Sequence, residues 1–310
     1  MILVGDVGGT RTRLALAERA GDGWRITGLE ERRTAPDILE AVAAFVRASA
    51  GGRVSGAAFS GAGAPAVDGS IRLTNADVKL DPQELARAAR VARAVVVNDF
   101  RAIAEAIPHL PRDALLPCGG GQPMRGEPVA VLGPGTGLGV AIGAESAGGW
   151  HVIPGEGGHV DLAPVDDEEL EVWQRLREAH GRLSVESVLS GPGLERLYAA
   201  VADGARLGAA EVDAAAWRGE PAAIRAHALF TRWLGRVAGN VALTAGARRG
   251  VYLAGGILPR WGARFDAAAF RRAFEDKPPY TEWLRAIPTF LVMHPQPGLL
   301  GLAVLAESAK

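Results

Sequence analysis

The pattern of apolar and polar residues divides the chain into short strands and amphipathic helices. Short apolar, β-branched runs predict strands at 2–7, 14–17, 24–29, 54–59, 95–97, 129–132, 150–153, 251–257 (running into a turn) and 289–293. Apolar residues at helical spacing predict helices at 36–50, 82–92, 101–107, 166–180, 221–245, 265–274 and 298–306. Strands that alternate with helices in this way are typical of the α/β class.

A stretch rich in proline and glycine interrupts this pattern after the helix at 101–107. Pro108, Pro111 and Pro117 are followed there by a run of three glycines, and both residue types disfavour regular structure. A chain of 310 residues is also long for a single core. We therefore expect two α/β lobes, a small one from 1–109 plus 297–310 and a large one from 110–296.

The composition narrows the possible partners and location. The chain is 48% hydrophobic, as in an ordinary globular protein. Its net charge of −1 means that no excess of basic residues favours binding to nucleic acid or to an anionic membrane. No apolar run approaches the roughly 18 residues of a membrane span, and the first residues lack the charged region of a signal peptide. Cys118 is the only cysteine, which agrees with a reducing cytoplasm.

Two polar residues follow directly after the apolar strand at 95–97. Burying the carboxylate of Asp99 at this point is costly unless it is paired with another group or serves in binding or catalysis. In open α/β sheets, sites gather at the carboxyl ends of strands, so Asp99 is a candidate general base. The alternative is that Asn98 or Asp99 only caps the helix that follows.

Two glycine-rich turns lie between pairs of strands. The first is Asp6-Val7-Gly8-Gly9-Thr10 and the second is Gly135-Thr136-Gly137. A strand after each turn predicts a hairpin, not the strand–turn–helix of a dinucleotide fold. Glycines let backbone amides face an anion closely, so the pair predicts a polyphosphate site, with Asp6 placed to hold a metal through water. The alternative is two unrelated turns, with Asp6 as a turn acid.

Three further polar or glycine-rich loops are candidates for ligand contacts. Glu156 and His159 are surrounded by Pro and Gly, which exposes their polar ends, and a carboxylate with an imidazole is suited to reading hydroxyls. No His-x-x-x-His accompanies them, which disfavours zinc. Glu156 could instead cap backbone amides, and Glu186 could cap a short helix. Gly255-Gly256 would let a flat ring or a helix N-terminus approach.

In order along the chain, these motifs resemble those of the bacterial glucokinases, in the hexokinase–actin ATPase superfamily. The matching strings are Asp6-Val7-Gly8-Gly9-Thr10 with Arg13, Asn98-Asp99-Phe100, Gly135-Thr136-Gly137-Leu138-Gly139, Pro154-Gly155-Glu156-Gly157-Gly158-His159, Leu189-Ser190-Gly191-Pro192-Gly193-Leu194 and Ala254-Gly255-Gly256-Ile257. Arg11 stands where this family often has Asn. A cysteine-rich zinc motif of related sugar kinases is absent, which indicates the zinc-free branch.

The resemblance implies a two-lobed ribonuclease-H-like fold with a cleft between the lobes, and ATP-dependent phosphorylation of glucose with Mg²⁺. It implies Asp99 as catalytic base and a sugar site from Asn75, Asn98, Asp99, Glu156, His159 and Glu186. It implies ATP contacts from Asp6, Gly8, Gly9, Thr10, Arg13, Gly135, Thr136, Gly137, Gly255 and Gly256, with Mg²⁺ near Asp6. We expect a cytoplasmic homodimer. The alternatives are a kinase of another hexose or amino sugar, or a sugar-sensing regulator, which would need a DNA-binding extension.

Overall fold

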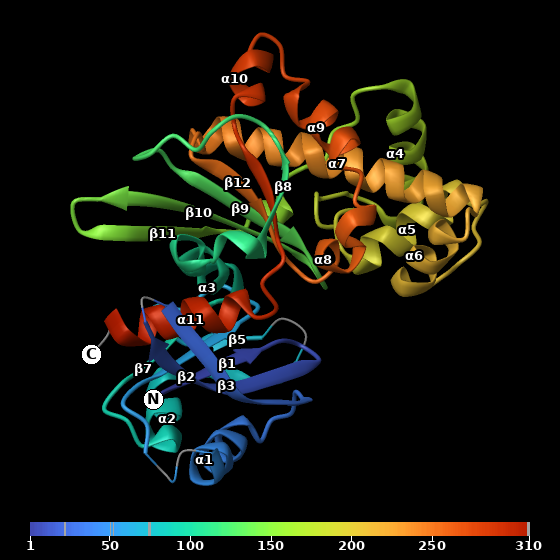
Figure 1. Cartoon of the computed structure of the whole chain (residues 1–310). Coiled ribbons are helices and arrows are strands. Elements are labelled where there is room, and N and C mark those ends of the chain that lie inside the picture. Colours follow the sequence, from blue (N-terminus) through green and yellow to red (C-terminus); the bar gives the residue numbers. More distant parts are fainter. Residues whose placement is uncertain (22, 50, 52, 74–75, 309–310) are drawn as a thin grey trace. The chain divides into compact units, whose positions relative to one another are not determined.

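The computed structural model describes residues 1–21, 23–49, 51, 53–73 and 76–308. It consists of two compact units, Met1–Arg112 with His294–Lys310, and Asp113–Met293. The sequence pattern had placed the corresponding boundaries at 109/110 and 296/297. Each unit is built on a sheet with helices packed against it (Figure 1), so the α/β class is confirmed.

The sheet of the first unit has five strands in the order β3-β2-β1-β4-β7. Their bounds are Ile2–Val7 (β1), Arg11–Ala20 (β2), Gly23–Arg33 (β3), Ala57–Gly61 (β4) and Ala94–Asn98 (β7). β2 is antiparallel to β1 and β3, whereas β1, β4 and β7 are parallel. The carboxyl ends of these three parallel strands therefore meet at one edge of the sheet.

Helices cover both faces of this first sheet (Figure 1). Ile38–Ser49 (α1) and Pro82–Ala89 (α2) pack on one face, and Asp99–Ala106 (α3) and Pro297–Ser308 (α11) pack on the other. α3 and α11 approach so closely that a Cβ on Gly301 would lie 1.8 Å from the carbonyl oxygen of Ala102. The short strands Ile71–Arg72 (β5) and Lys79–Leu80 (β6) form a ribbon beside the sheet.

The second sheet has six strands in the order β11-β10-β9-β12-β13-β8. Their bounds are Leu115–Gly119 (β8), Val129–Pro134 (β9), Leu138–Ser146 (β10), Gly149–Gly155 (β11), Gly250–Leu253 (β12) and Thr289–Val292 (β13). β9, β10 and β11 form consecutive hairpins, and β12 is parallel to β9 and β13. The sequence pattern missed β8. Its Pro117 is tolerated because β8 lies at the sheet edge.

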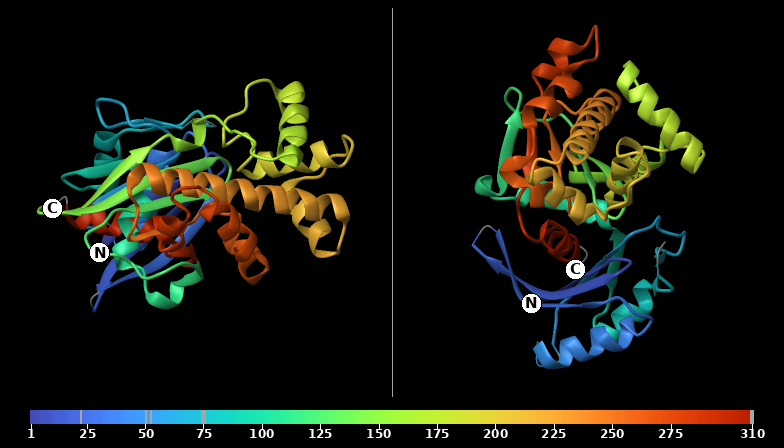
Figure 2. Two further views of the ribbon diagram at one scale, coloured as in Figure 1. Left: turned by 90° about the horizontal axis from the view of Figure 1, so that it is seen from above. Right: turned by 90° about the vertical axis from the view of Figure 1, so that its right-hand side faces the viewer.

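A long helix, Pro221–Ala245 (α7), organises the rest of the second unit. It has the bounds that the apolar spacing predicted, and Phe230, Trp233 and Leu234 are fully buried in one core. Around its first half, beyond the strands, lie Asp167–His180 (α4), Gly191–Val201 (α5) and Ala209–Trp217 (α6) (Figure 2). The other helices of this unit are Leu258–Trp261 (α8), Ala267–Glu275 (α9) and Thr281–Arg285 (α10), with 3-10 turns at Gly157–His159 and Gly262–Arg264. Two further 3-10 turns, Ile107–His109 and Arg112–Ala114, lie at the end of the first unit and at the boundary.

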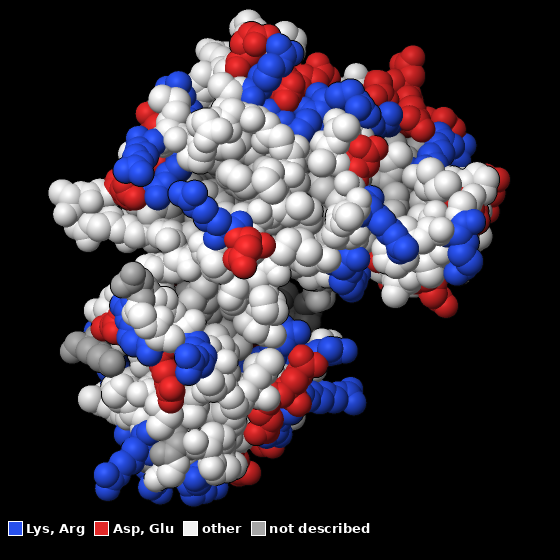
Figure 3. All heavy atoms as spheres, viewed as in Figure 1, with Lys and Arg blue, Asp and Glu red and all other residues white. Residues whose placement is uncertain are grey.

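Charged side chains of both signs are interspersed on the face of each unit shown in Figure 3. This distribution agrees with the net charge of −1. Within the described part of the chain, none of the helices combines the length and the apolar character that crossing a membrane requires.

Candidate active site

Polar side chains gather at the carboxyl edge of the three parallel strands in the first unit. The register places Asp6 of β1 beside Ser60 of β4, and Gly61 of β4 beside Asn98 of β7. The Ser60 hydroxyl donates a hydrogen bond of 2.8 Å to Asp6 Oδ1. The strand order therefore brings residues far apart in the sequence to the sheet edge where α/β folds bind ligands.

Asp6 is a carboxylate held in a partly desolvated place. Burial raises the pKa of Asp6, while the hydrogen bond from Ser60 and the charge of Arg13 act in the opposite direction. Arg13 Nη1 lies 3.7 Å from Asp6 Oδ2, but Arg13 Nε also donates to Glu31 at 2.9 Å. Because this guanidinium is shared between two carboxylates, Asp6 is incompletely neutralised and would gain from a nearby cation.

Asn98 and Asp99 have different roles at the start of α3. Asn98 is the helix N-cap: its Oδ1 accepts hydrogen bonds from Phe100 N at 2.9 Å and Arg101 N at 3.2 Å, and its amide donates to Gly63 O at 3.3 Å. Asp99 is the first helical residue, and its Oδ1 also accepts from Phe100 N, at 2.9 Å. The capping interpretation therefore applies to Asn98. Asp99 is half-buried at the helix end whose partial positive charge attracts anions.

The first glycine turn is a tight hairpin between β1 and β2 that is held from the neighbouring strand. Gly8 N donates to Arg11 O at 2.9 Å, which closes the turn. Thr34, just after β3, donates its hydroxyl to Gly8 O at 2.7 Å and its amide to Thr10 O at 3.0 Å. Nothing near Thr34 in the sequence signalled this contact, which depends on the pairing of β2 with β3.

The second glycine turn, between β9 and β10, is anchored by a carboxylate. Leu138 N donates to Glu186 Oε2 at 2.7 Å, and Gly191 N, at the start of α5, donates to Gly135 O at 2.8 Å. A Cβ on Gly137 would lie 2.3 Å from Glu186 Oε2. Glu186 therefore does not cap a short helix, as one interpretation of the sequence had it. Its side chain lies against the hairpin.

The glycine pair after β12 packs on the same hairpin. Gly255 has φ +86°, and a Cβ there would lie 2.4 Å from Pro134 O, so glycine is required for both backbone shape and space. Ile257 N donates to Pro134 O at 3.3 Å. Gly256, in contrast, faces open space. The turn is thus closed against the hairpin on one side and accessible on the other.

The loop that carries Glu156 and His159 lies flat on β10. A Cβ on Gly158 would be 2.2 Å from Leu138 O, and one on Gly157 would be 2.9 Å from Val140 Cβ. The side chains of Glu156 and His159 remain 57% and 61% exposed, with Oε2 and Nε2 3.9 Å apart. Glu156 makes no capping hydrogen bond. The glycines therefore allow close backbone packing, while the two polar side chains stay available to a ligand.

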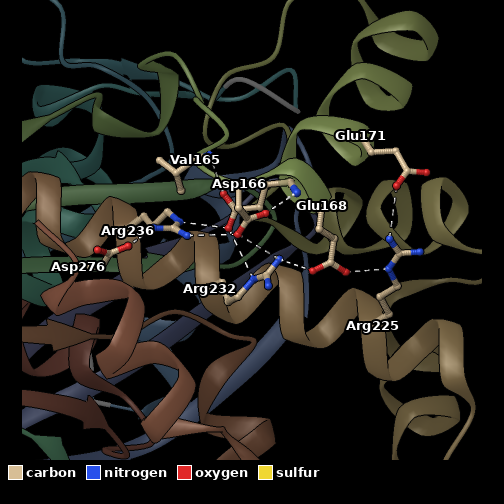
Figure 4. A network of polar contacts seen from close by, with 9 residues as sticks. Val165, Asp166, Glu168, Glu171, Arg225, Arg232, Arg236 and Asp276 are labelled. Atoms are coloured by element: carbon tan, nitrogen blue, oxygen red, sulfur yellow. Dashed lines mark hydrogen bonds and ion pairs between the residues drawn. The ribbon is translucent and has the colours of Figure 1, made fainter.

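A network of arginines and carboxylates fixes the segment that follows this loop (Figure 4). Arg236 Nε donates to Glu169 at 3.1 Å and Arg232 Nη2 donates to Glu168 at 2.8 Å, which joins α7 to α4. Glu169 is fully buried and its Oε2 accepts from Val165 N at 3.1 Å. A buried carboxylate needs such partners, and here they hold the chain between His159 and α4.

Within each unit, the residues expected to bind substrates lie close in space. The first unit groups Asp6, Asn98 and Asp99 along one sheet edge. In the second unit, direct backbone and side-chain contacts interlock the loops 134–138, 156–159 and 254–257. Asn75, also expected at the sugar site, lies outside the described residues.

Comparisons with known proteins agree along the whole chain. The family model described as Glucokinase matches residues 3–309. A glucokinase from Paramagnetospirillum magneticum is 41% identical, covering 100% of this chain and 98% of its own. The crystal structure of glucokinase from an Antarctic psychrotroph has a TM-score of 0.87 at 30% identity, covering 99% and 98%. That of Balamuthia mandrillaris glucokinase in complex with glucose has a TM-score of 0.84 at 25% identity, covering 99% and 93%. The family and the two-unit kinase fold inferred from the motifs are confirmed, and the chain belongs to the glucokinase family.

Proposed function

We propose that this enzyme transfers the γ-phosphoryl group of ATP to the 6-hydroxyl of glucose, with Asp99 as the general base. Family membership over nearly all of the chain supports the reaction, and a relative of the same fold has been crystallised with glucose. The observation that carries the assignment of the base is the position of Asp99, directly after β7 at the edge that also holds Asp6.

The reaction needs a base because a sugar hydroxyl has a pKa far above neutrality. In this proposal the carboxylate of Asp99 accepts the 6-hydroxyl proton as the oxygen attacks the γ-phosphorus in line. Asn98 caps the helix and so fixes the backbone from which the Asp99 side chain extends. Rigid placement of the base is what makes proton transfer efficient.

The phosphates of ATP are assigned to the two glycine hairpins. Gly9 and Thr10 in the first unit and Thr136 and Gly137 in the second would present backbone amides, and Arg13 would add a positive charge. The amides of Gly8 and Gly135 close the two turns, so these glycines would instead let the phosphates approach closely. Preorganised donors of this kind stabilise charge that develops during phosphoryl transfer. The open side of Gly256, with Gly255 packed below it, is the proposed place of the adenosine.

Mg²⁺ fits the residues at the first hairpin. Mg²⁺ is commonly held by one or two carboxylates together with substrate phosphates and water. Asp6 is such a carboxylate, and burial raises its pKa despite the opposing hydrogen bond from Ser60 and the charge of Arg13. Among the described residues there is no cluster of three or more metal-ligating side chains, so most of the remaining ligands would be phosphate and water. The ion would neutralise phosphate charge.

The sugar ring is assigned to Asn98, Asp99, Glu156, His159 and Glu186. Carboxylates and imidazole suit the vicinal hydroxyls of a hexose because they accept and donate hydrogen bonds. Asn75 remains a predicted contact. Expected features that rest on the sequence alone are the homodimer and the cytoplasmic location.

The proposal is tested by replacing Asp99 with Asn. The variant should lower kcat by roughly 10²–10⁴-fold, the usual size of a lost general base, while calorimetry shows glucose still bound. Turnover is measured by coupling ADP release to a dehydrogenase assay. Turnover near that of the native enzyme would remove Asp99 from the mechanism.

The same assay identifies the preferred sugar. A panel of glucose, mannose, fructose, glucosamine and N-acetylglucosamine should give the highest kcat/KM with glucose. A higher value with an amino sugar would reassign the substrate, and no ADP release with any sugar would contradict kinase activity.

A further inference from the structure

We infer that Glu186 is a positioning residue for the second phosphate hairpin and couples nucleotide binding to sugar binding. The inference rests on the proposed function and adds a role to a residue otherwise assigned to the sugar alone. It starts from the hydrogen bond of 2.7 Å that Leu138 N donates to Glu186 Oε2. Charge-assisted bonds of this kind are stronger than bonds between neutral groups.

Glu186 is attached on its backbone side to the loop that carries the proposed sugar ligands. Its amide donates to Gly158 O at 2.8 Å, between Glu156 and His159. Its carbonyl oxygen accepts from the Ser190 hydroxyl at 2.8 Å, and Ser190 is the N-cap of α5. One residue therefore contacts the loop 156–159, the start of α5 and the hairpin.

The hairpin is shaped to receive this carboxylate. A Cβ on Gly137 would lie 2.3 Å from Glu186 Oε2, so only a glycine leaves the space that the carboxylate occupies. Besides the strand ladder, the turn has two backbone bonds, from Gly135 N to Gly137 O and from Gly191 N to Gly135 O. The bond to Glu186 is the one that ties its exit, at Leu138, to another loop.

The two carboxylate oxygens of Glu186 differ in their partners. Oε2 accepts from Leu138, whereas no donor among the described residues is hydrogen-bonded to Oε1. A sugar hydroxyl that donates to Oε1 would fix the carboxylate, and with it the Leu138 amide and the phosphate hairpin. Coupling of this kind is reciprocal, so bound nucleotide would tighten sugar binding by the same factor.

The test compares Glu186→Ala with Glu186→Gln, and the ligand is the non-hydrolysable analogue AMP-PNP with Mg²⁺, titrated calorimetrically without sugar. Glu186→Ala should weaken AMP-PNP binding about 10-fold or more, because a hydrogen bond to a charged group is lost. Glu186→Gln should recover most of this affinity, because the amide oxygen can accept from Leu138 N. Glu178→Ala, which removes an exposed glutamate of α4, is the matched control.

A second titration at saturating glucose measures the coupling. Glucose should tighten AMP-PNP binding in the native enzyme and in Glu178→Ala, and this enhancement should disappear in Glu186→Ala. Native AMP-PNP affinity in Glu186→Ala, or equal losses in the Ala and Gln variants, would overturn the positioning role. Failure of the native enzyme to bind or phosphorylate glucose would instead contradict the proposed function, and the sugar-free titrations would still test the contact with Leu138.

Discussion

The two glycine hairpins look alike in sequence but are held in place by different chemistry. The first, at Gly8, is fixed by the neutral hydroxyl and the amide of Thr34. The second, at Gly137, is fixed by the carboxylate of Glu186 and by the start of α5. The first belongs to a continuous strand ladder, because Thr34 follows the partner strand β3. The second is joined to loops that come from distant parts of the chain.

This difference shows that the same short glycine motif can be held in place either by the adjacent strand or by loops from distant parts of the chain. The atoms that surround the two glycines show the same difference. A Cβ on Gly8 would lie 3.2 Å from Arg11 O, within its own turn, whereas a Cβ on Gly137 would strike Glu186 at 2.3 Å. A substitution that disturbs the first hairpin should therefore weaken nucleotide binding alone. A substitution that disturbs the second hairpin should weaken glucose binding as well.

Among substitutions that test the difference between the hairpins, the largest effect should come from Gly137→Ala. The added Cβ displaces the Glu186 carboxylate and breaks its bond to Leu138, so affinity for AMP-PNP should fall roughly 10–100-fold, the size of a lost charge-assisted hydrogen bond. Glucose affinity should fall too. Gly8→Ala is the matched change, and calorimetry with each ligand should show only a few-fold loss of nucleotide affinity. Equal effects of the two substitutions would contradict the comparison.

Asp6→Asn should have an intermediate effect and should separate binding from stability. Removing the carboxylate should raise the Mg²⁺ concentration needed for half-maximal activity about 10-fold, as for one lost charge-assisted contact. Because burial raises the pKa of Asp6 in the folded state, its ionisation costs stability as pH rises through that pKa. The ligand-free variant should therefore unfold at a higher temperature than the native protein at pH 7.

The same residue gives a pH signature that distinguishes the first hairpin from the second. As pH falls, Asp6 should become protonated earlier than an ordinary aspartate, and nucleotide affinity should decline with it. Asp6→Asn should flatten this acid limb. An unchanged acid limb in the variant would assign the titration to another group.

Thr34→Val should have the smallest effect. It removes the hydroxyl bonds to Gly8 O and to the Thr12 hydroxyl but keeps the amide bond to Thr10 O, so KM for ATP should rise roughly 2–10-fold, as for the loss of neutral hydrogen bonds. KM for glucose should not change. Thr27→Val, within β3 and away from the hairpin, is the control. A rise in KM for glucose would mean that support of the first hairpin is not local.

The sequence predicted what depends on local pattern. Apolar spacing fixed the bounds of α7, and strand–glycine–strand runs located both hairpins, because hydrophobic periodicity and glycine turns act over a few residues. The contacts of Thr34 and Glu186 could not be found in this way. Thr34 reaches Gly8 only through strand pairing, and Glu186 reaches Leu138 across 48 positions of the chain.

Some elements were also missed for physical reasons. β8 contains Pro117 and is stable only because it pairs along one side, at the edge of the sheet. α6 lacks a clear apolar stripe, since alanines occupy much of Ala209–Trp217, and packing against α7 supports it. In both cases the neighbouring element decides the structure.

The close packing of α11 on α3 has a consequence for synthesis on the ribosome. Leu299, Leu302 and Ala303 complete the apolar layer over strands that end by Asn98, and residues 113–293 are translated in between. At about 5–20 residues per second, this face of the first sheet is covered only by α3 for roughly 10–40 s before α11 is made. Nascent chains halted before Pro297 should therefore bind chaperones through this face, and release of the α11 segment from the exit tunnel should end that exposure.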